Sequence, residues 1–237
     1  MKHIVSFSGG KDSTAMLLLL LERRYPVDRI IFVDTTKEFP QMYRHIERVQ
    51  KLCPVPIERV EINYDYWFSE HVKRRGKRKG ERGYGWPSQR NRWCTALKRE
   101  AFAAAAAGIK YNSLQRGNPA IVPADVVQYH GIAADESDRI KNNPAIKYPL
   151  AEWGLTEADA LQYCYSRGLD WDGLYDAGFA RVSCFCCPLK RVSELRLIYR
   201  KFPELWAKLY EMDQRSVFPY KSGKRVSDFA RRFASEL

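Results

Sequence analysis

Short apolar runs alternate with longer amphipathic or leucine-rich stretches along the first two thirds of the chain. The apolar runs predict strands at residues 3–5, 29–33, 57–62, 125–131 and 146–150. The stretches between them predict helices at residues 14–24, 41–52 and 94–107. Strands that alternate with helices form a parallel sheet covered by helices. We therefore expect an α/β fold, a Rossmann-like doubly wound parallel sheet of about five strands with flanking helices.

The last third of the chain is predicted to be helical. Thr156 is a predicted N-cap of one helix. Further helices are predicted at residues 192–200 and along the tail, 202–237. We expect one globular unit, in which residues 1–150 form the α/β core and residues 151–237 form a C-terminal helical part.

A glycine-rich turn lies where the first predicted strand meets the first predicted helix. It reads Ser6-Phe7-Ser8-Gly9-Gly10-Lys11-Asp12-Ser13. Gly9 and Gly10 lack Cβ atoms, so the backbone can turn sharply and approach a ligand. The free N–H groups of the new helix favour an anion at this point, and Lys11 adds positive charge. Asp12 is suited to hold a metal ion nearby. The alternative is a glycine-rich turn without a ligand.

Polar residues also follow the second and fourth predicted strands. Asp34 and Thr35 come after the second strand, and Gly131, Asp135 and Arg139 come after the fourth. The carboxyl ends of parallel strands meet at one edge of a sheet, so these loops should share a crevice with the glycine-rich turn. Asp34 could accept a hydrogen bond from a ribose hydroxyl or an adenine amine, and Arg139 could contact an anion. A solvated turn is the alternative for Asp34.

The composition is that of an ordinary globular protein except for its charge. The 237 residues carry a net charge of +12. No segment reaches the roughly 18 apolar residues that a membrane helix needs. The chain begins with a strand and shows no signal peptide, so we expect a cytoplasmic protein that does not bind membranes. The sequence leaves a homodimer open.

Most of this charge lies in a segment that interrupts the alternation of strands and helices. Residues 64–93 are rich in glycine and are predicted to form a long loop. Between residues 73 and 99, eleven Lys or Arg stand against one acid. With Tyr84, Trp86 and Trp93 interleaved, the segment could follow a phosphodiester backbone and stack bases. It could equally cover a nucleotide and an anionic co-substrate, or be a solvated flexible loop.

The cysteines are the second strong signal. In a cytoplasmic protein the six cysteines are not expected to form disulfides. Cys184, Cys186 and Cys187 lie together in one loop, and Cys94 stands at the start of a predicted helix, where the pKa of a thiol is lowered. Together they predict a site of three or four thiolates for zinc or an iron–sulfur cluster. A thioredoxin-like redox pair and buried inert thiols are the alternatives.

Five motifs stand in order along the chain. They are SGGKDS at 8–13, VDTTKEFP at 33–40, RWCTALK at 92–98, GIAADES at 131–137 and SCFCCPLK at 183–190. Together they resemble the phosphoadenosine phosphosulfate (PAPS) reductase family of the adenine nucleotide alpha hydrolase, or PP-loop, superfamily. Members of that superfamily grip the pyrophosphate of ATP and act at its alpha phosphate.

The resemblance implies both a nucleotide site and a metal site. The implied nucleotide-binding residues are Ser6, Ser8, Gly9, Gly10, Lys11, Asp12, Ser13, Asp34, Thr35, Gly131, Asp135 and Arg139. The implied metal ligands are Cys94, Cys184, Cys186 and Cys187. Comparable cysteines in related sulfonucleotide reductases, and in the sulfurtransferase of DNA phosphorothioation systems, hold an iron–sulfur cluster. We therefore expect a 4Fe–4S cluster, with Zn²⁺ as the alternative.

Two features depart from the reductases of the family. Those enzymes carry a nucleophilic cysteine in the C-terminal tail, whereas the last cysteine here is Cys187. The adjacent cysteine pair of assimilatory reductases is replaced by Cys94-Thr95. The fourth ligand is assigned to Cys186. Cys53 and Cys164 are predicted core residues, and either is an alternative fourth ligand.

The leading hypothesis is an ATP-dependent enzyme that adenylates a substrate, releases pyrophosphate and delivers sulfur, in the manner of an ATP-pyrophosphatase-type sulfurtransferase. Lys11 and Asp12 are the predicted catalytic residues, and Lys11 acts with Mg²⁺ to offset the charge of the phosphates. The acceptor is nucleic acid, because of the basic segment at 73–99, or a small anionic co-substrate. The alternatives are a sulfonucleotide reductase and a nucleotide-binding module with structural zinc that binds nucleic acid.

Overall fold

The computed structural model describes residues 1–115 and 121–236, and it confirms the predicted fold class. Within this described part, one sheet contains five strands in the order β3-β2-β1-β4-β5. The strands are β1 (Lys2–Phe7), β2 (Arg29–Asp34), β3 (Ile57–Glu61), β4 (Val126–His130) and β5 (Ile146–Lys147). All neighbouring strands are parallel. The order reverses between β1 and β4, which is where open α/β sheets bind their ligands.

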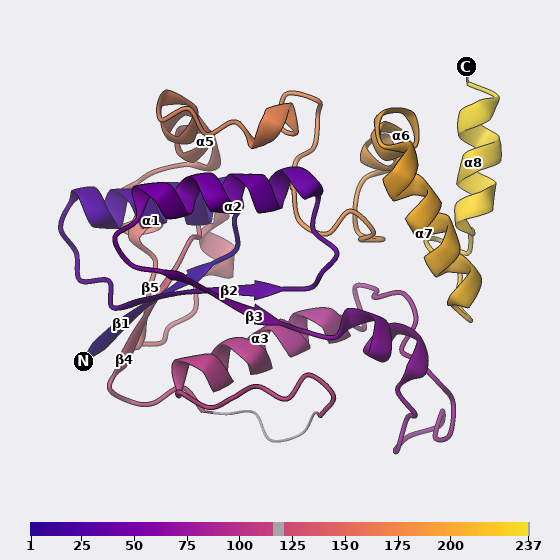
Figure 1. The fold of residues 1–237 in the computed structure, drawn as a ribbon, viewed down its shortest axis with the longest axis horizontal. Helices are drawn as coiled ribbons and strands as arrows, with labels where there is room; N and C mark the ends of the chain where they lie inside the picture. Colours follow the sequence, from indigo (N-terminus) through magenta and orange to yellow (C-terminus); the bar gives the residue numbers. More distant parts are fainter. Residues whose placement is uncertain (116–120, 237) are drawn as a thin grey trace.

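Helices cover both faces of the sheet (Figure 1). The helices α1 (Lys11–Glu22) and α2 (Pro40–Leu52) lie on one face, and α3 (Trp93–Ala106) lies on the other. Helix α1 is apolar around most of its circumference because it packs between the sheet and α5 (Glu157–Ser166). Such a helix is expected to be buried on all sides.

The region after β4 differs from the prediction in one respect. The 3₁₀ turn η2 (Ala134–Arg139) follows β4, but β5 ends at Lys147 instead of continuing to residue 150. The predicted longer strand is wrong, because Pro149 lacks the N–H group of a strand ladder and begins the short helix α4 (Pro149–Glu152). The predicted cap at Thr156 is confirmed, since its hydroxyl accepts a hydrogen bond from the Asp159 N–H at 3.2 Å.

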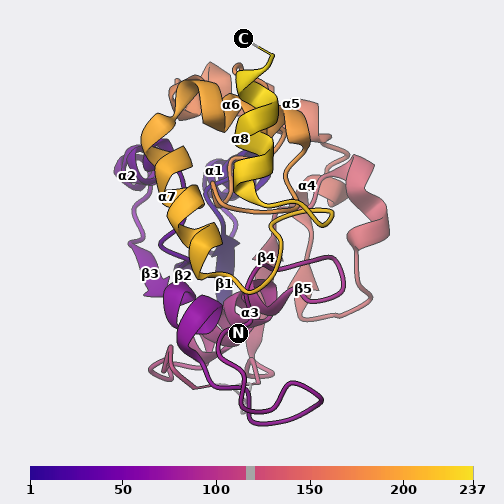
Figure 2. The same ribbon diagram turned by 90° about the vertical axis from the view of Figure 1, so that its right-hand side faces the viewer.

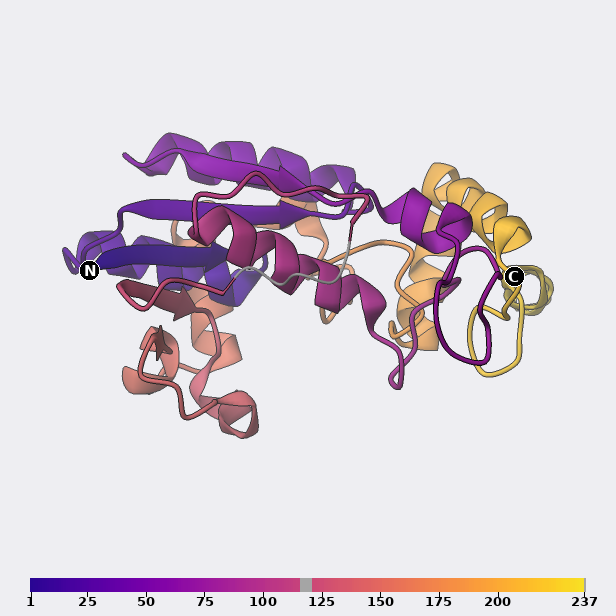
Figure 3. The ribbon, with the colours of Figure 1, turned by 90° about the horizontal axis from the view of Figure 1, so that it is seen from below.

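The remaining helices lie beyond the carboxyl ends of the strands (Figures 2 and 3). They are α6 (Val192–Lys201), α7 (Pro203–Arg215) and α8 (Val226–Ala234), and the short 3₁₀ turn η3 (Trp171–Gly173) precedes them. The division of the chain near residue 150 stays a prediction. In the described residues, no helix has the length and apolar character needed to cross a membrane.

A buried carboxylate joins these helices to the segment before α3. Asp213, on α7, is fully buried. Its Oδ1 accepts a hydrogen bond from Trp86 Nε1 at 2.9 Å, and its Oδ2 accepts one from the Val226 N–H at 2.9 Å. The guanidinium of Arg225 lies 3.8 Å from Oδ1. One side chain therefore fixes the basic segment, α7 and the start of α8 relative to one another.

We predict that Asp213→Ala lowers the free energy of unfolding by about 2–5 kcal/mol, because two buried N–H donors lose their acceptor. Urea unfolding measures the loss. The matched control is Glu204→Ala, an exposed acid on the same helix, for which we expect a change below about 1 kcal/mol. Equal losses in the two variants would show that Asp213 does not hold these elements together.

Candidate functional site

The turn between β1 and α1 packs closely on its neighbours. Gly9 has a φ of +76°, and a Cβ atom there would lie 2.5 Å from the sulfur of Met42 on α2. Ser8 and Ser13 bring their hydroxyl oxygens to 2.9 Å, and the Ser8 N–H donates to Ser13 Oγ at 3.1 Å. Ser6 lies within β1, just before the turn. The glycine-rich motif thus forms one compact loop at the end of the first strand.

Two aromatic side chains bind the glycine-rich loop and the N-terminus of α1. Gly10 is the N-cap residue of α1 and, as a glycine, has no side chain to cap the helix. The Lys11 N–H donates to the hydroxyl of Tyr175 at 3.1 Å, and the indole N–H of Trp171 donates to the Gly9 carbonyl at 2.7 Å. Residues 171–175 therefore hold the loop from the side. Sequence analysis missed both side chains, because no local pattern links them to the loop.

The loop after β4 reaches the same place. A Cβ atom on Gly131 would lie 2.8 Å from the backbone N of Ser13, so this glycine lets the two loops touch. Asp135 does not face the turn with a free carboxylate, because its Oδ1 accepts from the Glu157 N–H at 3.0 Å. Arg139 is exposed and pairs with Glu136. Of the residues predicted here, Gly131 touches the glycine-rich loop directly.

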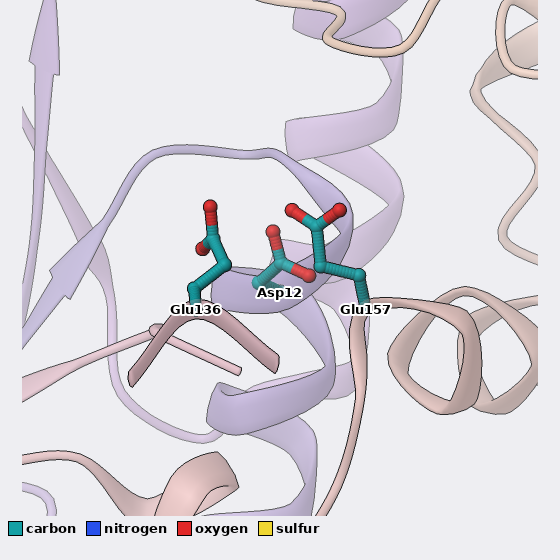
Figure 4. A group of neighbouring side chains, drawn as sticks. All are labelled: Asp12, Glu136 and Glu157. Carbon is teal, nitrogen blue, oxygen red and sulfur yellow. The ribbon is translucent and has the colours of Figure 1, made fainter. Parts of the chain in front are cut away.

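Three carboxylates converge on the first turn of α1 (Figure 4). Asp12, Glu136 and Glu157 each offer an oxygen within 4.8 Å of the other two. The buried Lys11 places Nζ 3.2 Å from Asp12 Oδ1 and 3.1 Å from Glu157 Oε1. Burial raises the pKa of Asp12, although the charge of Lys11 acts in the opposite direction. The site therefore contains one cation and three acidic groups.

This donor set fits the predicted Mg²⁺. Asp12 Oδ1 is buried, and it has only the ionic contact with Lys11 and no aligned hydrogen-bond donor. Magnesium prefers oxygen ligands and is usually held by one or two carboxylates together with phosphate oxygens. Glu136 and Glu157 were not among the predicted site residues. Glu136 does lie in the GIAADES motif, whereas the contact of Glu157 with Lys11 depends on the tertiary fold.

Asp34 and Thr35 are placed differently from the expectation. Asp34 is fully buried, and its oxygens are bound by Arg59 at 2.6 Å, by the Tyr43 hydroxyl at 3.0 Å and by the Thr36 N–H at 2.7 Å. Thr35 Oγ1 lies 3.1 Å from the sulfur of Cys184. The loop after β2 therefore faces the cysteines, and a nucleotide contact through these two side chains stays a prediction.

The four predicted cysteine ligands gather around one tyrosine. The pKa of the buried Tyr64 is raised by its burial and further by the nearby Cys186, Cys94, Cys184 and Cys187. The cysteine loop is tied to the loop after β2, because the N–H of its middle residue, Phe185, donates to the Lys37 carbonyl at 2.9 Å. The fold thus brings the two distant cysteine motifs together.

The Cys94 thiol is less acidic than predicted. All six cysteines of the chain are free, and Cys53 and Cys164 are buried core residues, as expected. The predicted lowering of the Cys94 pKa is wrong. Burial raises the pKa of this thiol, and the nearby Cys187 adds to the effect, so the helix N-terminus does not dominate. Burial also raises the pKa of Cys184.

The aromatic side chains of the basic segment pack in the protein core. Trp86 and Trp93 are buried, and Trp93 Nε1 donates to the Gly85 carbonyl at 3.0 Å. Tyr84 is stacked against Trp93, with ring centroids 5.9 Å apart. The predicted stacking of bases on these tryptophans is therefore wrong, because their rings serve the core.

A cavity of about 370 Å³ lies beside the cysteine loop. Its walls come from residues 36–43, from Phe185 and from α7, and they include Lys37, Lys208 and Arg215. Lys37 and Arg215 both pair with Asp65, at 2.6 Å and 3.4 Å. The cavity could therefore admit a small polar molecule next to the cysteines.

A parallel sheet with a glycine-rich loop at its switch point, leading into a helix, defines a nucleotide-binding α/β protein. The family model of the phosphoadenosine phosphosulfate reductase domain matches residues 2–190, and the chain belongs to this family. The family is adenine nucleotide alpha hydrolase-like, and its members bind adenine nucleotides.

Similar proteins occur in archaea and bacteria. An uncharacterised protein of Methanocaldococcus jannaschii is 29% identical over 216 residues, which is 86% of this chain and 40% of that protein. A second one from the same organism is 24% identical, over 95% of this chain and 50% of that protein. The chain thus spans half or less of the length of these two relatives. The adenosine 5′-phosphosulfate reductase of Bacillus mycoides is 24% identical over 73% of this chain and 68% of that enzyme.

Two solved structures are distantly similar. The PAPS reductase of Candida auris, in a phosphate complex, is 14% identical with a TM-score of 0.44, and the match covers 78% of this chain and 82% of that one. The U34-tRNA thiolase of Methanococcus maripaludis, with its 4Fe–4S cluster, is 11% identical with a TM-score of 0.44, over 98% of this chain and 80% of that one.

A buried histidine supports the glycine-rich loop from below. His45 is fully buried on α2, its Nε2 lies 3.0 Å from Thr14 Oγ1, and its ring stacks on Trp171 at 4.1 Å. Burial lowers the pKa of His45 to about 3, and the charge of Arg48 acts in the same direction. The neutral imidazole is therefore part of the folded structure around neutral pH.

We predict that this histidine makes the protein sensitive to acid. Between pH 6.5 and pH 3 the unfolded chain binds a proton at His45 that the folded chain does not, so stability falls as the pH falls. From pH 7 to pH 5 the linked loss is about 2 kcal/mol. Urea unfolding of wild type and His45→Gln at both pH values checks this, since the variant should lose about 2 kcal/mol less. An equal loss in both proteins would contradict a buried neutral imidazole.

Proposed function

We propose that the chain is an ATP-dependent enzyme that acts at the alpha phosphate of ATP, adenylates an acceptor and releases pyrophosphate, in a reaction coupled to sulfur transfer. The observation that carries the proposal is the first turn of α1. There, the helix N-terminus, the buried Lys11 and three carboxylates surround one small volume beside the switch point of the sheet. This set of groups suits a phosphate chain and its cation.

Each residue of the loop then has a role. Backbone N–H groups at Gly9 and Gly10 and the hydroxyls of Ser8 and Ser13 cradle the pyrophosphate. Lys11 balances negative charge that grows on the leaving pyrophosphate. A Mg²⁺ ion held by the carboxylates of the first turn would neutralise the phosphate oxygens and orient them.

Tyr175 belongs to the same cradle. Its hydroxyl accepts the hydrogen bond of the Lys11 N–H, so its own proton is available for a phosphate oxygen. Gly131, Asp135 and Arg139 are our proposed contacts on the adenosine side. Asp34 would act by holding the loop after β2 in place, because its oxygens are already bound.

The reaction is an in-line displacement. An oxygen of the acceptor attacks the alpha phosphorus, the bond to the bridging oxygen breaks, and pyrophosphate leaves with the bonding electrons. In the coupled step, inorganic sulfide or a thiolate attacks the activated atom of the acceptor. The new bond to sulfur forms there, and AMP leaves with the electron pair of the broken bond.

We further propose that Cys94, Cys184, Cys186 and Cys187 hold an iron–sulfur cluster. Thiols from both cysteine motifs lie close enough to Tyr64 to raise its pKa, so the fold brings four candidate thiolate ligands to one region. Iron–sulfur clusters are held by cysteine thiolates of this kind. Lys98 lies beside this site, bound to Glu38 at 3.3 Å, and its charge offsets that of the thiolates. A cluster there would supply a site for binding sulfur.

A sulfonucleotide reductase is the second candidate. The family and the similarity to the Bacillus mycoides enzyme favour it. We rank it second because the carboxylates and the buried Lys11 at the first turn of α1 suit a phosphate chain with its cation. A module with structural zinc is the third candidate.

The reaction class is tested by the products that form from ATP in Mg²⁺ buffer, with water as the acceptor. We expect AMP and pyrophosphate, and a rate that falls about 10²–10³-fold in Lys11→Met, because a preorganised charge at the leaving group is lost. The matched control is Lys51→Met, an exposed lysine on α2. Urea midpoints confirm that both variants fold. Formation of ADP and phosphate, or tight binding of adenosine 5′-phosphosulfate without binding of ATP, would refute the proposal.

The metal is tested on protein purified without oxygen. We expect a brown protein with broad absorption near about 400 nm and acid-labile sulfide. Cys94→Ala should lose most of the iron, whereas Cys53→Ala, a core cysteine outside the site, should keep it. A colourless protein with about one zinc per chain would contradict the cluster.

A further inference from the structure

The basic segment contains a hairpin rather than a disordered loop. We define residues 71–83 as the basic hairpin. An antiparallel bridge joins Val72 to Arg82, the Lys73 N–H donates to the Glu81 carbonyl at 3.0 Å, and the Gly80 N–H donates to the Lys73 carbonyl at 2.9 Å. The backbone of this segment is therefore paired across its two arms.

The base of the hairpin is fixed in the protein. The Gly83 N–H donates to the His71 carbonyl at 2.8 Å, and a Cβ atom on Gly83 would lie 2.3 Å from the Phe68 carbonyl oxygen. The guanidinium of Arg78 lies 3.9 Å over the ring of Phe218, which precedes α8. The base of the hairpin therefore packs on the short π-helix η1 (Tyr66–Glu70), and Arg78 contacts the segment between α7 and α8.

Most of its cations have no acidic partner among the residues that the structure describes. Lys73 and Arg78 share the single acid, Glu81, at 3.3 Å and 2.5 Å. The other cations are exposed and form no ion pair with a described residue: Arg74, Arg75, Lys77, Lys79 and Arg82 in the hairpin, and Arg90 and Arg92 after it. Like charges held close together on an ordered scaffold repel one another, and a polyanion relieves this repulsion.

We propose that the basic hairpin, together with Arg90 and Arg92, binds the phosphodiester backbone of a nucleic acid, without reading its sequence. Seven unpaired cations exceed what a single nucleotide needs, and the candidate nucleotide site has its own cation in Lys11. Trp86 and Trp93 are buried, so they offer no surface on which bases can stack. Recognition therefore depends on charge and not on stacking.

The position of the hairpin connects it to the cysteine site. Arg92 is the N-cap residue of α3, and Cys94 is in the first turn of the same helix. A strand bound along the hairpin and this N-terminus would pass next to the cysteines. The inference rests on the proposed function, because it names nucleic acid as the acceptor of the adenylation.

The test measures binding of fluorescein-labelled 20-mers of RNA and DNA, single- and double-stranded, by anisotropy at several salt concentrations. The first variant replaces Arg74, Arg75, Lys77 and Lys79 with Gln. The matched control replaces Lys2, Arg24, Lys51 and Lys201, which are exposed cations away from the hairpin, with Gln. Both variants lose the same total charge, and none of these side chains belongs to the proposed catalytic site.

We expect wild type and control to bind alike, and the hairpin variant to bind at least about 10-fold more weakly. Its slope of log affinity against log salt should be smaller by about 3, because four phosphate contacts are lost. Affinities for poly-dA and poly-dT should agree within about threefold, because no base is read. The RNA and DNA arms identify which of the two is preferred.

Three results would overturn the inference. The wild type could fail to bind any nucleic acid at low salt. The hairpin and control variants could lose equal affinity, or the wild type could strongly prefer one nucleic-acid sequence over another. Formation of AMP and pyrophosphate from ATP is measured on the same proteins. Normal ATP turnover without nucleic-acid binding refutes only the claim that the hairpin binds nucleic acid. Nucleic-acid binding without ATP turnover refutes only the proposed function.

Discussion

Close packing around the first turn of α1 is the constraint on which the rest of the structure depends. Gly9 lies against α2 at a distance that leaves no room for a side chain, and Gly131 does the same against the backbone of Ser13. Trp171 and Tyr175 complete the enclosure by bonding to the loop backbone. Segments from every third of the chain therefore meet at one turn, and the backbone groups that face a ligand are fixed before it arrives.

The loop after β2 packs against the cysteine loop. Asp34 anchors its start through Arg59 and Tyr43, and Thr35 touches Cys184. The same loop accepts a backbone hydrogen bond from Phe185 at Lys37. A displacement of the cysteine loop would therefore have to move this short loop as well.

The elements of this architecture and the meeting of its motif-bearing loops could be predicted from the sequence, whereas the long-range contacts of single side chains could not. The strands, the glycine-rich loop and the cap at Thr156 depend on residues close together in the chain, so their patterns were visible. Glu157 and Tyr175 reach the site only through long-range packing, so no pattern of residues in the sequence predicts their place there. The predictions of base stacking on the tryptophans and of a lowered Cys94 pKa were wrong for the same reason. Burial determines both properties, and burial depends on the whole fold.

The two ends of the basic hairpin are joined by the backbone hydrogen bond from the Gly83 N–H to the His71 carbonyl. Because the chain leaves and re-enters the core at adjacent points, the length and composition of the hairpin can change without displacing the sheet. The entropic cost of lengthening such a closed loop grows only slowly with its length. The hairpin can therefore be replaced by another segment without disturbing the fold. Evolution could alter which partner the protein engages while the nucleotide chemistry stays untouched, and an engineer could do the same by grafting.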